Sequence, residues 1–186
     1  QILFRCERQP HVKTTQTSMK KFFAVIMLSI FSIIFWSHYQ TPPPQGKADK
    51  ILVEKSARQL SLYANGQLLK TYTVSLGFDP QGKKQQEGDG RTPEGVYSID
   101  YKNPNSRYHL SLHVSYPNEN DTKNAIQRGV SAGGNIMIHG MTNGYGYIGK
   151  FHRFKDWTAG CIAVTDKEMD EIWQAVDEGT TIEIKP

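Results

Sequence analysis

One cysteine and one histidine in this chain have the residue types and setting for thiol catalysis. His139 follows the apolar run 136–138, and Cys161 precedes the apolar run 162–164. Each run predicts a short buried strand, so both residues would lie at strand ends. A thiolate is the reactive form of cysteine, and an adjacent imidazole can take its proton and lower its pKa. The alternative is a buried structural cysteine and a structural histidine.

The neighbours of these two residues favour the catalytic interpretation. Gly140 follows His139 and Gly160 precedes Cys161, and glycine permits close backbone approach and unusual dihedral angles. The chain has two cysteines, and Cys6 lies before a long apolar run. If that run enters a membrane, Cys6 and Cys161 lie on opposite sides of it and cannot pair. An unpaired cysteine in an exported domain indicates a reactive thiol.

Two further histidines, His109 and His113, could suggest a metal site. They share one face of the predicted strand 108–114. At roughly 3.3 Å per residue they lie about 13 Å apart, which is too far to share one zinc ion. We therefore predict no metal site, and the thiol chemistry assigned to Cys161 and His139 needs no cofactor.

Alternating apolar residues predict a mainly β domain with a few short helices. Asn65-Gly66 between two alternating runs predicts a hairpin turn. A short helix is predicted over 121–128, and a second helix is predicted to begin at Thr165 and end at Gly179. The segment 78–91 is rich in glycine, glutamine and charge and predicts an exposed loop. The expected strands include residues 51–53, 59–63, 68–76, 96–99, 108–114, 136–138, 162–164 and 181–184.

The N-terminal part has the layout of a secretory signal or membrane anchor. Met19 precedes two lysines and an apolar run, 22–36, which is short for a full membrane span. A basic cytoplasmic tail before residue 19 is the alternative to an upstream segment. We predict an upstream or disordered segment (1–18), a signal peptide or anchor (19–39), a Pro-rich linker (40–49) and a folded domain (50–186).

Charge separates the same two parts of the chain. The net charge is +4 and the isoelectric point is near 9.0. Residues 1–36 hold five basic residues and one acidic residue, whereas residues 37–186 hold 17 of each. The folded domain is therefore neutral overall, which argues against nucleic acid as a partner.

Four motifs together resemble the L,D-transpeptidase (YkuD-type) catalytic-domain family. The sequence His139-Gly140-Met141, a loop over 142–157 and then Thr158-Ala159-Gly160-Cys161-Ile162 is similar to the family signature. The turn 88–95 matches its G-D-G-x-T-P-x-G element, and 115–118 resembles an element of one subgroup. The resemblance covers roughly residues 51–185 and identifies 50–186 as the catalytic domain.

The resemblance implies a β-sandwich that acts on peptidoglycan stem peptides through a thioester. Cys161 would be the nucleophile and His139 the base, with its ring oriented by the carbonyl of Gly140. The N–H groups of Gly160 and Cys161 would form the oxyanion hole, and Thr158 would shape the turn and contact substrate. The implied location is the periplasm or cell envelope, on the inner membrane if residues 20–39 anchor the domain.

Substrate contacts and reaction outcome are left open by the sequence. Arg153 and Lys155 precede Cys161 and could bind substrate carboxylates, and Tyr116 is a further candidate contact. Many family members carry polar residues where this chain has Ala159 and Ala163. Cross-linking of stems or attachment of a lipoprotein acceptor is the first hypothesis. A Cys-dependent amidase or endopeptidase and a non-catalytic wall-binding module are the alternatives.

Overall fold

The computed structural model describes residues 21–27, 29 and 42–186. Residues 21–27 and residue 29 are helical. Within the described ranges, no helix is both long and apolar enough to cross a membrane. The predictions for residues 1–18, and for most of 19–39, lie outside the described residues.

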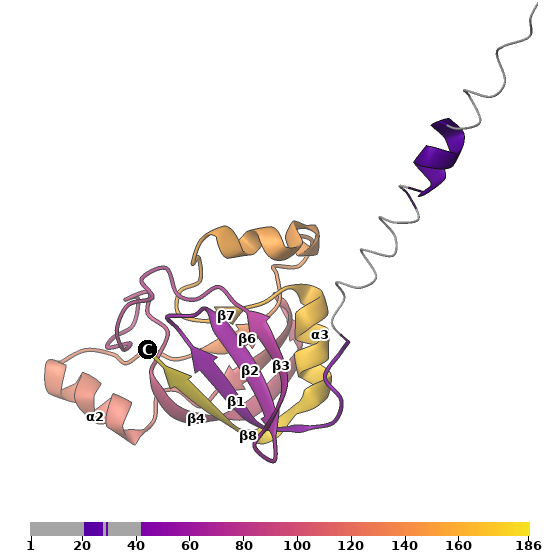
Figure 1. The fold of residues 1–186 in the computed structure, drawn as a ribbon. Coiled ribbons are helices and arrows are strands. Elements are labelled where there is room, and N and C mark those ends of the chain that lie inside the picture. The colour runs from indigo at the N-terminus through magenta and orange to yellow at the C-terminus, as the bar shows by residue number, and fades with distance from the viewer. Residues whose placement is uncertain (1–20, 28, 30–41) are drawn as a thin grey trace, which may run out of the picture. The chain divides into compact units, whose positions relative to one another are not determined.

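The folded unit, residues 43–186, is built on one curled sheet of eight strands (Figure 1). The strand order is β3-β2-β1-β8-β4-β5-β6-β7, in which β1–β8 and β6–β7 are parallel and the other neighbours are antiparallel. The prediction of a mainly β domain with few helices is confirmed. The elements are β1 (Ala48–Glu54), β2 (Gln59–Ala64), β3 (Gln67–Thr73), β4 (Gly95–Ser106), β5 (His109–Val114), α2 (Glu119–Arg128), β6 (Met137–His139), η1 (Gly146–Phe154), β7 (Ile162–Ala163), α3 (Asp166–Ala175) and β8 (Val176–Lys185).

The two ends of the strand order meet, and this curls the sheet around its core. Ser75, just after β3, bridges Ala163 of β7, and Gly77 bridges Thr158. The largest fully buried side chains inside the curl are mostly aliphatic: Ile51, Leu60, Leu62, Leu76, Ile99, Leu112, Ile138, Ile162, Met169, Ile172 and Ile182, with Tyr72. The closure places the chain before β7 against the end of β3.

The hairpin between β2 and β3 forms at the predicted turn. Asn65 and Gly66 have φ values of 50° and 78°. Positive φ at both central residues is the geometry of the two-residue turn that matches strand twist. The turn therefore fixes the register in which Ala64 faces Gln67.

Helix α3 begins where the sequence predicted. The Thr165 side chain accepts the N–H of Glu168, and the Glu168 carboxylate accepts the N–H of Thr165, which forms a capping box. Met169 and Ile172 lie on the buried face of the helix. Burial of each such side chain contributes about 1.5–3 kcal/mol to the free energy of folding.

The predicted end of this helix was wrong. Helix α3 ends at Ala175, and Val176 is already extended and paired with Ala48 of β1. Val176 falls inside the range of the predicted helix, but it is buried as the first residue of β8. Gly179 lies inside β8 with a φ of 90°.

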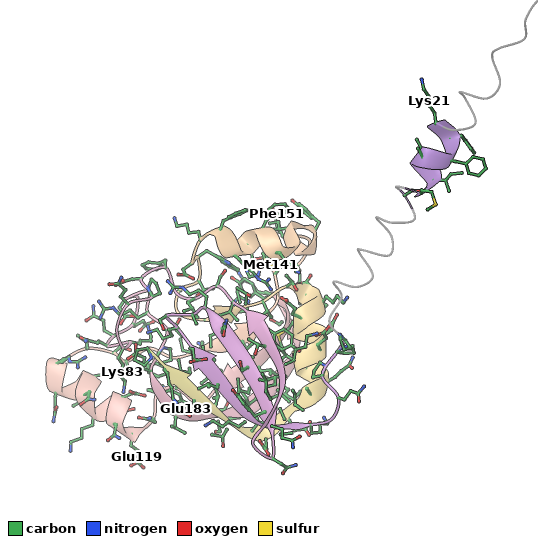
Figure 2. All side chains as sticks on the ribbon, viewed as in Figure 1. Lys21, Lys83, Glu119, Met141, Phe151 and Glu183 are labelled. Atoms are coloured by element: carbon green, nitrogen blue, oxygen red, sulfur yellow. The ribbon has the colours of Figure 1, made fainter. Side chains whose placement is uncertain are left out.

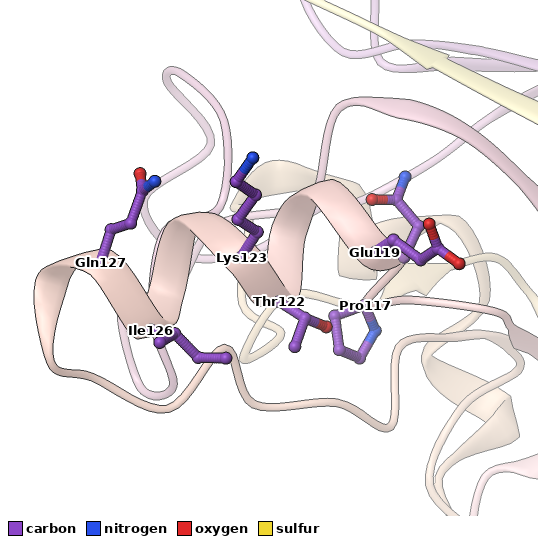
Figure 3. A pocket seen from close by; sticks show the side chains of 7 residues that line it. Pro117, Glu119, Thr122, Lys123, Ile126 and Gln127 are labelled. Carbon is purple, nitrogen blue, oxygen red and sulfur yellow. The ribbon is translucent and has the colours of Figure 1, made fainter.

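Helix α2 confirms the predicted short helix and begins two residues earlier, at Glu119. Asn118 supplies the N-cap, which stabilises the free N–H groups of the first turn. Ile126 is 72% exposed and lines a shallow hollow with Thr122 on the outer side of the helix (Figure 3). This hollow contains none of the predicted catalytic residues.

Candidate active site

His139 ends β6, and Cys161 directly precedes β7, the neighbouring parallel strand. His139 ends β6 opposite Ala163 of β7, and Ile138 lies opposite Ile162. The two isoleucines are fully buried in the core, so alternation directs Cys161 and His139 to the other face. An offset of two residues places them on the order of 7 Å apart along the strands. The structure therefore brings together the two residues of the catalytic hypothesis.

The hydrogen bonding of His139 fixes which ring nitrogen carries the proton. Nδ1 lies 2.6 Å from the carbonyl oxygen of Gly140. A carbonyl can only accept, so Nδ1 is protonated and Nε2 of the neutral ring is free to accept a proton. Burial lowers the pKa of His139, against the opposing effect of the Gly140 bond. The rings of Tyr108 and Trp157 pack against it at 4.6 and 5.8 Å between centroids.

Asp166, the first residue of α3, holds the turn that orients His139. Its Oδ1 accepts the N–H of Met141 at 2.7 Å. A Cβ placed on Gly140 would lie 2.7 Å from the same oxygen, so this contact requires glycine. The helix dipole already accounts for an acidic residue at a helix start, so this role of Asp166 has no separate sequence signal.

The turn before Cys161 is closed by one hydroxyl group. Thr158 Oγ1 accepts the N–H of Gly160 at 3.1 Å and donates to the carbonyl of Cys161 at 2.7 Å. Gly160 has a φ of 133°, and a Cβ there would lie 2.7 Å from the carbonyl oxygen of Arg91. Thr158 is buried in this turn rather than exposed to a substrate. Because the Gly160 N–H is bonded to Thr158, it is not a free oxyanion donor here.

The G-D-G-x-T-P-x-G turn, residues 88–95, packs against the turn before Cys161. A Cβ on Gly77 would lie 2.1 Å from the carbonyl oxygen of Gly90, so the backbones touch at this point. Asp89 accepts the N–H groups of Gln85, Gln86 and Arg91. Burial alone would raise the pKa of Asp89, but these bonds and the ammonium group of Lys84 lower it.

Lys84 shows that the predicted exposed loop is partly internal. Its ammonium group is buried and donates to Asp89 at 2.8 Å and to the carbonyl of Gln86 at 3.0 Å. The charge of Lys84 also acts on the Cys161 thiol. Sequence composition did not reveal this buried cation, because lysine is usually a surface residue.

The expected low pKa of Cys161 is not what the structure supports. Burial raises the pKa of the thiol, and the Met137 N–H and Lys84 offset this only in part. The thiol lies 3.5 Å from the carbonyl oxygen of Asn135. Among the hydrogen bonds of the described residues, none joins Cys161 to His139. Burial thus disfavours the charged form of both residues, because it raises the pKa of the Cys161 thiol and lowers the pKa of the His139 imidazole.

Arg153 and Lys155 differ in their environment. Arg153 forms an ion pair with Glu168 at the start of α3, so its charge is already matched. Burial would raise the pKa of Glu168, but bonds from Arg153 and Thr165 lower it. Lys155 is exposed just after η1 and stays a candidate for binding carboxylates.

Tyr116 is buried, which does not suit the predicted substrate contact. It is 3% exposed, and its hydroxyl donates to the carbonyl of Ala132 at 3.0 Å. Its ring packs edge-on against Tyr97 at 5.9 Å. In this structure Tyr116 holds the segment that leads into β6.

The two histidines considered for a metal each pair with an aspartate. His109 Nε2 lies 2.7 Å from Asp170, and His113 Nδ1 lies 2.6 Å from Asp100. In the part of the chain that the structure describes, no group of three or more His, Cys, Asp or Glu residues is placed to hold a metal ion.

The fold and this site identify the class of protein. The chain belongs to the YkuD family of L,D-transpeptidase catalytic domains, whose profile matches residues 48–184. The match includes both strands of the site and the turn that supports Cys161.

Particular relatives share the domain. YafK of Escherichia coli (strain K12), assigned provisionally as an L,D-transpeptidase, is 31% identical over 132 residues, which cover 68% of this chain and 46% of YafK. A point variant of the helical cell shape determining protein Pgp2 from Campylobacter jejuni aligns with a TM-score of 0.58 and 25% identity, over 77% of this chain and 49% of Pgp2. Bd1075 of Bdellovibrio bacteriovorus shares the fold, with a TM-score of 0.51 and 22% identity over 76% of this chain and 51% of Bd1075. The chain spans about half the length of these relatives.

Proposed function

We propose that this domain is a cysteine acyltransferase that acts on peptidoglycan stem peptides. The observation that carries the proposal is the placement of Cys161 beside His139, whose Nδ1 is bonded to Gly140 while Nε2 stays free. Membership of the L,D-transpeptidase family supports the substrate class. The likeness to Pgp2 supports a role in building or shaping the cell wall.

The first half of the proposed reaction forms a thioester. Nε2 of His139 accepts the thiol proton as Sγ of Cys161 bonds to the carbonyl carbon before a terminal D-alanine. The resulting oxyanion is stabilised by backbone N–H donors, of which the Cys161 N–H is the proposed one. Collapse breaks the C–N bond, and His139 returns the proton to the departing amine.

The second half decides between transfer and hydrolysis. An amine from another stem, or from a lipoprotein, attacks the thioester while His139 takes its proton, and the thiol is released. Water in place of the amine gives hydrolysis. The raised pKa of the Cys161 thiol favours transfer of its proton to His139 during the attack.

Product analysis with muropeptides tests the proposal. Wild-type protein should give cross-linked or shortened products, and Cys161→Ser should give neither. His139→Ala should lower turnover by about 10²- to 10⁴-fold, the usual contribution of a general base. His113→Ala is the comparison variant: its ring is on the same face of the sheet, opposite Met137, but it pairs with Asp100, so this variant should lose far less turnover than His139→Ala. Equal losses in both histidine variants contradict the assignment of the base.

The location that accompanies this function is also a proposal. Residues 19–39 would direct the domain through the inner membrane and hold it there, with the linker 40–49 outside. The support is the sequence pattern of two lysines followed by an apolar run. Protease added to spheroplasts with an unbroken inner membrane should digest the domain. Protection of the domain from the protease contradicts export.

A further inference from the structure

The outer side of η1 exposes four aromatic rings, which we call the aromatic face: Tyr145, Tyr147, Phe151 and Phe154. Tyr147, Phe151 and Phe154 are 81%, 71% and 87% exposed, and Tyr145 is 51% exposed. The rings form two pairs, Tyr145–Tyr147 at 6.2 Å and Phe151–Phe154 at 5.9 Å between centroids. Figure 2 shows Phe151 on the outer side of η1.

Packing within the domain does not account for this exposure. Single apolar residues are common on protein surfaces, whereas a contiguous exposed cluster marks an interaction site. Ile148 and His152 take the inward side of η1, where they line a hollow that Phe151 and Phe154 do not reach. The two phenylalanines are therefore covered by no part of the chain that the structure describes, and an external apolar surface would bury them.

The charges beside the aromatic face are positive. Lys150 and Lys155 are exposed, and neither forms an ion pair with another described residue. The segment 144–155 contains no Asp or Glu. Residues 37–186 hold equal numbers of basic and acidic residues, so the excess of positive charge at η1 is local.

The acidic residues near η1 are already engaged. Glu168 pairs with Arg153, and Asp156 pairs with Arg58. Asp166 accepts a backbone N–H at the start of the loop that leads to η1. These carboxylates therefore do not neutralise the exposed lysines, and the aromatic face would attract an anionic surface.

Exposed rings between unpaired lysines are the pattern of a surface that lies on an anionic membrane. Aromatic rings enter the boundary between headgroups and acyl chains, while lysine ammonium groups stay with the phosphates. Lipids are fluid and can surround rings that protrude from a helix. A glycan strand is a less suitable occupant, because phenylalanine offers no polar group to a sugar hydroxyl.

The proposed anchor keeps such a surface within reach. The 11 residues 37–47 lie between the apolar run and β1, and they span at most about 36–40 Å. A short tether raises the effective concentration of a binding face to about the millimolar range. Weak contacts from a few rings and two lysines are then enough to hold the face at the membrane.

We propose that the aromatic face of η1 rests on the anionic surface of the membrane that carries the domain. Trp157, three residues after η1, packs against His139, so the contact would orient the candidate active site relative to the membrane. The proposal rests on the exported, anchored location proposed above and adds the surface that orients the site. Stem peptides close to the membrane are then the ones that the site meets.

Hydrogen exchange of the full-length protein in lipid nanodiscs tests the contact. Discs of phosphatidylcholine alone are compared with discs of equal parts phosphatidylcholine and phosphatidylglycerol. Each lysine near an anionic surface favours docking roughly fivefold, so amide exchange in residues 144–155 should be about 10- to 30-fold slower in the anionic discs. High salt should remove the difference, because it screens these charges. Equal exchange in the two kinds of disc overturns the proposal.

Variants on two exposed faces separate this contact from a general effect of the discs. Phe151→Ser combined with Phe154→Ser should fold, because both rings are exposed, and should abolish the slow exchange. Ile126→Ser is the matched control, because Ile126 is 72% exposed on α2, a helix with acidic residues in its first turn. This control should exchange as the wild type does. Unchanged slow exchange in the double serine variant overturns the proposal.

Two further readouts separate failure of the anchor from failure of the contact. If the wild-type protein leaves the discs in a high-salt wash, the proposed anchor is wrong. Exchange is then measured at low salt on the protein mixed with vesicles of the same two compositions. Slow exchange on the anionic vesicles alone supports the contact, and equal exchange on both overturns it. Slow exchange with soluble peptidoglycan strands, and not with anionic lipid, assigns the aromatic face to the glycan and also overturns the proposal.

Discussion

Replacing Asp166 with alanine tests how the structure orients the proposed base. The substitution removes the carboxylate that accepts the Met141 N–H at 2.7 Å and so holds the turn containing Gly140. A hydrogen bond to a charged group contributes about 1.5–3 kcal/mol. If that energy positions the His139 ring, its loss converts to roughly 10- to 150-fold in rate, at about 1.4 kcal/mol per tenfold. We expect kcat to fall within that range with little change in KM.

The assay compares Asp166→Ala with two further variants. Asp166→Asn keeps an oxygen acceptor and should recover most of the activity. Asp170→Ala is the matched control on the same helix, because its carboxylate pairs with His109 and is half exposed. Turnover on muropeptides and the melting temperature are measured for each. If Asp166→Ala retains kcat within twofold of wild type while folded, the Gly140 turn does not depend on this carboxylate and the reasoning is refuted.

Three further predictions address the thiol, the turn and the support of the site. Burial raises the pKa of Cys161, so its thiolate is scarce at pH 7. Alkylation by iodoacetamide should therefore accelerate as the pH rises above about 8.5. An alkylation rate that is constant from pH 6 upward contradicts the raised pKa. Gly160→Ala should lower the free energy of unfolding in urea by about 3 kcal/mol, because φ is positive and a Cβ would overlap the backbone. Gly144→Ala should lower it by about 1 kcal/mol, because φ is positive there but a Cβ would have no atom within 4 Å. Equal losses in the two variants contradict the overlap. Lys55→Ala should lower the free energy of unfolding by about 3–5 kcal/mol, because Lys55 is buried in an ion pair. Lys47→Ala removes an exposed ion pair and should lower it by under about 1 kcal/mol. Similar urea unfolding midpoints for the two variants contradict a structural role for Lys55.

Local patterns in the sequence were enough to place the reactive residues on strand ends. The apolar runs beside His139 and Cys161 became β6 and β7, and the Asn65-Gly66 turn and the Thr165 cap formed as predicted. Each of these features depends on residues within a few positions of one another. Spacing and side-chain type therefore carry the necessary information.

The features that the sequence did not reveal depend on contacts between distant residues. Arg153 was a candidate for binding substrate carboxylates, but Glu168 of α3 pairs with it. The spacing of Val176 from the other apolar residues is that of a helix, yet Val176 pairs with Ala48 and lies in a strand. The raised pKa of Cys161 follows from how deeply the turn is buried, which no local pattern reports.

The place of β8 in the sheet has a consequence for synthesis. It is the last of the eight strands in the chain, yet it lies fourth in the sheet, between β1 and β4. Before β8 has been synthesised, the β1–β2–β3 meander and the β4–β7 group lack the strand that lies between β1 and β4. Each then presents an unpaired edge that can associate with other chains. Completion of the sheet therefore waits until the final strand has been synthesised.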